Sequence, residues 1–145
     1  MSTYRRMLAA VDLSEDSRAV ATRACELARE FGASLQLLHV VEFVPIEPMS
    51  DSLVPVVQID EQMMTRARTQ IDDLARELGL PSDAVHVEIG SAKAEILRYA
   101  REQQIDLVVI GSRERHGLSL LVHRTEGSVL HGARCDVLAV RVPAG

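Results

Sequence analysis

Short segments of continuous apolar residues alternate along the chain with segments in which apolar residues recur at helical spacing. Continuous apolar runs at 7–11, 34–41 and 105–111 predict three strands that are buried on both faces of a sheet. The segment 84–89 alternates strictly between apolar and polar residues, which is typical of a half-exposed strand. The run at 137–142 is β-branched and mostly apolar, and it predicts a fifth strand.

Helical periodicity fills the intervals between these strands. The first helix is expected to begin at a cap formed by Ser14 and to end at Gly32. A second helix is expected over residues 59–78, and a third follows a cap at Ser91. Apolar residues at helical spacing over 118–129 predict a fourth helix before the last strand.

Strands that alternate with helices predict an α/β fold with a parallel sheet and right-handed crossovers. The half-polar strand at 84–89 suits an edge of the sheet, and the doubly apolar strands suit its interior. The strand order 3-2-1-4-5, flanked by four helices in a Rossmann-like arrangement, satisfies both. This order places a switch point between the first and fourth strands, whose carboxyl ends carry Asp12 and Gly111. Residues 1–145 are expected to form this one domain.

Composition narrows the class of protein. Aromatic residues make up only 3% of the chain, so the core is expected to be aliphatic. The net charge of −5 argues against a broad basic face for nucleic acid, and no run approaches the roughly 20 apolar residues of a membrane span. Cys25 and Cys135 form no CxxC motif, which is typical of reduced thiols in a cytoplasmic protein.

The fifth strand lies at an edge of the expected sheet, although its sequence is poorly suited to solvent. A flat, mostly apolar edge is normally covered, since its unpaired main chain invites association. Pairing with a second copy of the chain would cover it through a two-fold homodimer. The chain's own termini are the alternative cover. The residues expected in the dimer interface are Val137, Leu138, Val140 and Val142.

The loop after the fourth strand is the first candidate for chemistry. The sequence GSRERHG at 111–117 joins a strand to a helix, where main-chain N–H groups can be directed at an anion. The window 113–124 is also rich in basic residues, with Glu114 as its one acid. A solvated basic helix end is the alternative interpretation. The residues expected to contact an anion here are Gly111, Ser112, Arg113, Arg115 and Gly117.

Asp12 is the second candidate. Its carboxylate could accept hydrogen bonds from a ribose or a base amine across the switch point, or it could only favour the N-terminus of the first helix. The segment 43–57 carries three prolines and could form a lid, an irregular connector or a contact surface for a protein partner. We find no nucleophile elbow, Walker lysine or zinc-binding motif, so neither catalytic residues nor a metal site is expected.

Four stretches together resemble the universal stress protein family over essentially the whole chain: MLAAVDLSEDS, LLHVVE, DLVVIGSRERHGLSLL and VLHGARCDVLAVRV. The last is most similar to the universal stress protein A branch. The resemblance implies the same five-stranded sheet with four helices, a homodimer through the last strand, and a cytoplasmic protein of the stress response. Many members bind ATP, and the positions that match their binding motif here are Asp12, Val40, Gly111 and Ser112.

The loop departs from the family pattern Gly-x-x-Gly, eight or nine residues, Gly-Ser/Thr. The second glycine would fall at Glu114, and the final Gly-Ser at His123 and Arg124. A carboxylate ~4 Å from a phosphate opposes binding by about 4 kcal/mol before screening, at an effective dielectric constant near 20. Tight ATP binding is therefore expected to be lost. The loop could still bind ATP or another phosphate-bearing anion weakly.

These observations favour a non-enzymatic regulatory or protective dimer with a degenerate nucleotide loop. One alternative is an adenine-nucleotide sensor that hydrolyses ATP weakly. The other is a protein-interaction module that uses the segment 43–57 as its contact surface.

Overall fold

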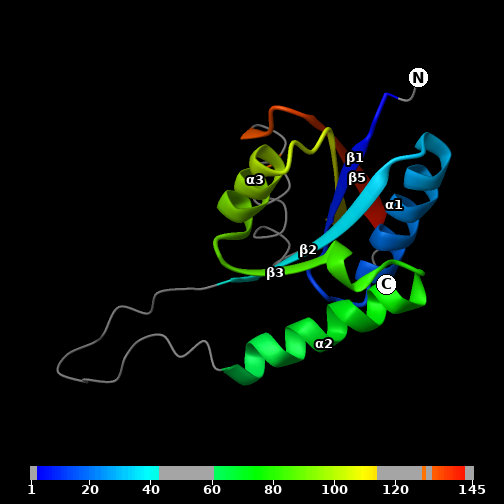
Figure 1. Ribbon diagram of the computed structural model, residues 1–145. Helices are drawn as coiled ribbons and strands as arrows, with labels where there is room; N and C mark the ends of the chain where they lie inside the picture. The colour runs from blue at the N-terminus through cyan, green and yellow to red at the C-terminus, as the bar shows by residue number, and fades with distance from the viewer. Residues whose placement is uncertain (1–2, 43–60, 114–128, 130–131, 143–145) are drawn as a thin grey trace.

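A five-stranded parallel sheet forms the centre of the molecule (Figure 1). The computed structural model describes residues 3–42, 61–113, 129 and 132–142. The strand order is β3-β2-β1-β4-β5, as the hydrophobic pattern predicts. The strands are β1 (Arg6–Ala10), β2 (Ser34–Glu42), β3 (Val85–Gly90), β4 (Leu107–Arg113) and β5 (Asp136–Val142).

Helices cover both faces of the sheet (Figure 1). Their bounds are α1 (Ser17–Phe31), α2 (Glu61–Glu77) and α3 (Ala92–Glu102), and a short 3₁₀ turn, η1 (Ser82–Ala84), precedes β3. Buried residues of α1 and α2 pack with one face of the sheet, and those of α3 pack with the other. The result is a three-layer α/β domain with a separate apolar cluster on each side of the sheet.

The two clusters are aliphatic, as the low aromatic content predicts, and successive residues of a strand point into opposite ones. On the α1–α2 side the fully buried members include Met7, Ala9, Leu37, Ile71 and Val109. On the α3 side they are Leu8, Leu38, Val108 and Val129. Strands β1, β2 and β4 therefore contribute to both clusters, which is why their sequences are continuously apolar.

The ends of the helices agree with the sequence in two cases and differ in one. Gly32 ends α1 with a φ of 65°, and the Ser91 hydroxyl accepts the N–H of Ala94 at 3.4 Å to cap α3. The N-cap of α1 is Asp16, which makes no side-chain capping bond, so the predicted cap at Ser14 lies two residues too early. The Ser14 hydroxyl accepts the N–H of Asp16 at 3.3 Å and donates to Asp12 at 2.6 Å.

The predicted fourth helix falls mostly outside the described residues, so the described part of the chain contains three α-helices and not four. Its last position, Val129, is fully buried on the α3 side of the sheet. The N–H of Ala133 donates to the carbonyl of Val129 at 2.9 Å, which is the spacing of an α-helical bond. The segment 43–57 and the rest of the loop after β4, residues 114–128, also lie outside the residues that the structure describes.

Strand β5 forms the edge of the sheet beside β4. Leu138 is 36% exposed, and Val137 and Val140 are partly buried. Val142 is only 4% exposed and belongs to the cluster under α1, so its side chain has little surface left for a partner. The half-polar strand β3 forms the opposite edge, as predicted.

Candidate functional site

The carboxyl ends of β1 and β4 lie side by side at the switch point of the sheet. The two strands pair from Met7 opposite Leu107 to Ala9 opposite Val109. Asp12 is three residues beyond Ala9, and Ser112 is three residues beyond Val109, so both residues lie at the carboxyl-terminal end of the sheet. Past this ladder the chain stays bonded to β2, since the N–H of Val11 donates to the carbonyl of Leu38 at 2.9 Å.

Asp12 is an exposed residue whose carboxylate is held by three donors. The Oδ1 atom accepts the main-chain N–H of Ser14 at 3.0 Å and the Ser14 hydroxyl at 2.6 Å. It also accepts the Ser17 hydroxyl at 3.1 Å. An Asp that bonds to the main chain two residues further on forms an Asx turn, which joins β1 to α1 here. The carboxylate is therefore fixed in place just beyond the carboxyl end of β1.

The turn contains a residue in an unusual backbone conformation. Leu13 has a φ of 61°, in the left-handed region that residues with a Cβ rarely adopt. The Leu13 side chain is partly buried against the cluster under α1. A conformation of this kind persists only where surrounding contacts fix it, and such residues cluster at functional sites. In this turn the contacts are the packing of Leu13 and the bonds to Asp12.

Gly111 lies near the end of β4, opposite Val140 of β5. A Cβ at this position would lie 3.0 Å from Cγ2 of Val20 in α1. The sequence suggested that this glycine is needed for approach to a phosphate. The structure supplies a second reason, because a side chain here would meet α1 in a tight contact.

The other predicted site residues are placed as follows. Val40 lies in β2 with its side chain buried in the cluster under α3, so only its main chain could meet a ligand. Ser112 and Arg113 pair with Arg141 and Val142 of β5. Arg115 and Gly117 lie outside the described residues, as do the positions at which the family loop is lost, Glu114, His123 and Arg124.

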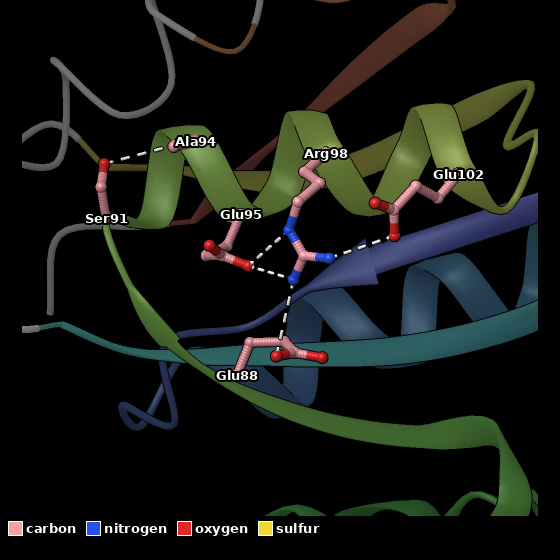
Figure 2. A network of polar contacts seen from close by, with 6 residues as sticks. All are labelled: Glu88, Ser91, Ala94, Glu95, Arg98 and Glu102. Carbon is pink, nitrogen blue, oxygen red and sulfur yellow. Dashed lines mark hydrogen bonds and ion pairs between the residues drawn. The ribbon is translucent and has the colours of Figure 1, made fainter.

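An ionic network that sequence reasoning missed joins α3 to β3 (Figure 2). The Arg98 guanidinium contacts Glu88 of β3 at 3.6 Å and Glu102 at 3.1 Å, and it also bonds to Glu95. The hydrogen bond that Arg98 donates to Glu95 is the first cause of the raised pKa of Arg98. A charge spacing of three and four residues along α3 could have indicated the Glu95 and Glu102 contacts, but the Glu88 contact depends on the fold.

A buried polar group lies on the same side of the sheet. The Tyr99 hydroxyl bonds to the side-chain oxygen of Gln36, and the Tyr99 ring centroid is 5.0 Å from that of His86. Burial and the nearby charge of Glu88 raise the pKa of Tyr99 to about 12. Nε2 of His86 is buried without a hydrogen-bond partner, and burial followed by the charge of Arg68 lowers the pKa of this imidazole.

The remaining candidate groups are structural in the part of the chain that is described. Burial raises the pKa of both Cys25 and Cys135, so they are protonated thiols, and neither forms a disulfide. Nδ1 of His39 is 2.8 Å from the carbonyl oxygen of Val11, so this imidazole on the interior strand β2 has a hydrogen-bond partner. No group of three His, Cys, Asp or Glu among the described residues could hold a metal ion.

No helix within the described ranges has the length and apolar character that crossing a bilayer requires.

Comparison with known proteins agrees with this arrangement of strands. Residues 3–141 match the model of the universal stress protein family. This chain belongs to the universal stress protein family. It is 36% identical over 143 residues to universal stress protein A homolog 2 of Coxiella burnetii, with 98% of each chain covered. It is 35% identical to homolog 1 of the same organism, over 94% of this chain and 96% of the relative.

Solved structures of other universal stress proteins share the fold. The universal stress protein UspA of Lactobacillus plantarum superimposes with a TM-score of 0.74 at 24% identity, over 97% of this chain and all of the other. A universal stress protein in complex with cAMP superimposes with a TM-score of 0.66 at 20% identity, over 96% of this chain and 98% of the other. At these identities the likeness concerns the fold alone.

Proposed function

We propose that this universal stress protein acts in the cytoplasm as a non-enzymatic regulatory or protective protein of the stress response, with a degenerate nucleotide loop. The proposal rests on one contrast within the site. The carboxylate of Asp12 is fixed at the switch point by three donors. The sequence beyond Arg113 has instead replaced the glycines that would bring the main chain to a triphosphate.

The bonds of Asp12 support a role in binding. Its Oδ1 atom accepts bonds from two serine hydroxyls and one main-chain amide, which orient the carboxylate. The carboxylate is fixed beyond the carboxyl end of β1, where ligands bind in open α/β sheets. We propose that it accepts hydrogen bonds from a ligand there and that the chain does not transform this ligand.

A second candidate function is the sensing of an adenine nucleotide, with slow hydrolysis of ATP. One observation favours it, namely that a universal stress protein of the same fold was solved in complex with cAMP. Asp12 could accept hydrogen bonds from the ribose or the base of such a ligand. Gly111 and Ser112 lie at the same edge of the sheet, beside the predicted phosphate position. A cyclic monophosphate carries less negative charge than ATP and would be repelled less by Glu114.

The proposed functional unit is a homodimer joined through β5. The strand is an edge in the single chain, and Leu138 on it is 36% exposed. Pairing of two β5 strands would cover this apolar edge and satisfy the main-chain groups that β4 does not reach.

Calorimetric titration of the purified protein with ATP, ADP, AMP and cAMP, with and without Mg²⁺, tests the proposed function. We expect weak or undetectable binding of ATP and no release of phosphate on prolonged incubation. Binding of ATP in the micromolar range, with steady release of phosphate, would show instead that the chain is an ATP-dependent sensor.

A further inference from the structure

The side chain of Ser17 is buried, with 5% of the residue exposed. A buried hydroxyl requires a hydrogen-bond partner, because its transfer from water is otherwise unfavourable. The partner of the Ser17 hydroxyl is Oδ1 of Asp12, at 3.1 Å. The exposed carboxylate beyond the carboxyl end of β1 is thus bonded to a buried hydroxyl.

The hydroxyl of Ser17 is not needed to begin the helix. Serine at the start of a helix usually serves as the N-cap and accepts a main-chain N–H two or three residues later. In α1 the N-cap position is Asp16, and Ser17 is the first helical residue. Its side chain donates backwards to Asp12. Alanine would fill the same buried position without requiring a partner, so the presence of serine is explained by its bond to the carboxylate.

We infer that Ser17, together with Ser14, is a positioning residue that fixes the Asp12 carboxylate for a hydroxyl or amine donor of the ligand. The inference rests on the proposed ligand role of Asp12. Rotation of the carboxylate away from its observed orientation would break the bonds of Oδ1 to both hydroxyls and to the N–H of Ser14. Leu13, which lies between Asp12 and Ser14, has a left-handed main-chain conformation in the same turn.

This arrangement assigns the binding determinant to the turn between β1 and α1 and not only to the loop after β4. A preorganised acceptor loses less conformational freedom when a ligand binds, which increases affinity. The part of the proposed site around Asp12 therefore keeps its hydrogen bonds, whereas the loop after β4 has lost the glycines of the family pattern.

The test compares three variants of the full chain, with cAMP as the calorimetric probe. We expect Ser17→Ala to weaken cAMP binding by roughly tenfold, the effect typical of one lost hydrogen bond to a charged group. Asp12→Ala is expected to weaken it at least as much. Ser34→Ala is the matched control, since its hydroxyl bonds to the carbonyl of Arg5 at 3.3 Å at the opposite end of the sheet.

A second readout separates positioning from a purely structural role. The three-bond couplings of Asp12 in the NMR spectrum report whether its side chain keeps one rotamer. We expect a single rotamer in the wild type and averaging in Ser17→Ala, at a temperature at which both proteins are folded. If Ser17→Ala does not fold, Ser14→Ala removes the other hydroxyl and is expected to show the same averaging with a smaller loss of affinity.

The outcomes distinguish the inference from the proposed function. Loss of cAMP binding in Asp12→Ala with unchanged binding and an unchanged Asp12 rotamer in Ser17→Ala would overturn the inference and leave the ligand role of Asp12 standing. No cAMP binding by the wild type, or equal binding by Asp12→Ala, would overturn that role and the inference with it.

Discussion

A Cβ added to Gly111 of β4 would lie 3.0 Å from Cγ2 of Val20 in α1. Valine is stiff in a helix because one χ1 rotamer dominates, so this methyl group cannot move aside freely. We expect Gly111→Ala to lower the free energy of unfolding by about 1 to 3 kcal/mol, as overpacking of a core does. Denaturant unfolding measures the change.

The matched background for this variant is Val20→Ala. Removing the valine methyl groups makes room for the added Cβ, so Gly111→Ala should have much less effect there. The two substitutions are in contact and are expected to be non-additive. An unaltered stability of Gly111→Ala in the wild-type background would show that packing does not require this glycine.

His86 should make the stability depend on pH. Burial, followed by the charge of Arg68, lowers its pKa below the ordinary value of 6.5, whereas Glu88 and Asp83 act in the opposite direction. The unfolded chain then takes up the proton before the folded chain does. This contribution to stability is complete above the unfolded pKa and is lost as the pH falls through the folded pKa. Unfolding at about pH 7.5 and about pH 5 measures it.

His86→Phe is the control for that measurement. Phenylalanine keeps an aromatic ring beside Tyr99 and removes both the titration and the unpartnered Nε2. We expect the variant to lose less stability than the wild type between the two pH values. An equal loss in both proteins would assign the pH dependence to other groups.

The prediction of the fold from the sequence succeeds where the hydrophobic pattern is continuous. Strands β1, β2 and β4 feed both apolar clusters, so their runs such as 7–11 identify them as interior strands. The alternation of β3 identifies an edge in the same way. The order 3-2-1-4-5 is one of the few parallel arrangements that satisfy both observations.

The site was less predictable because its bonds depend on backbone geometry. In the sequence, Ser14 fits a helix cap as well as it fits a donor to Asp12. In the structure its hydroxyl donates to Asp12 within a turn that contains the left-handed Leu13. In the sequence, Gly111 fits the start of a phosphate loop. The structure shows that the packing of α1 on β4 also favours a glycine there. The contact between Arg98 and Glu88 joins residues whose proximity follows from the packing of α3 on β3.

Arg98 should stabilise the attachment of α3 to β3. The Arg98→Gln variant leaves the carboxylates of Glu88, Glu95 and Glu102 without their shared cation. We expect a lower Tm at low ionic strength and a smaller difference in about 1 M NaCl, where the repulsion is screened. Arg23→Gln is the control, since its single exposed pair with Glu26 at 3.8 Å should contribute little. Equal effects of the two variants would contradict a role for the network.

Strand β5 is expected to form the dimer interface. Leu138→Asp places a charge on its exposed apolar side chain and should yield a monomer in light scattering after gel filtration. Ile89→Asp is the matched control on the opposite edge strand β3, where Ile89 is 44% exposed, and this variant should remain a dimer. A dimeric Leu138→Asp protein would contradict the β5 interface.

We propose that the fold and the Asp12 half of the site are kept, whereas the loop after β4 no longer binds ATP tightly. The most direct measurement is the ATP affinity of the wild type beside that of a triple variant, Glu114→Gly with His123→Gly and Arg124→Ser. This variant restores the family loop at the three positions where the sequence departs from it. We predict weak or no binding by the wild type and a clear gain in the triple variant. Micromolar ATP binding by the unaltered protein, or no gain on restoration, would contradict the account.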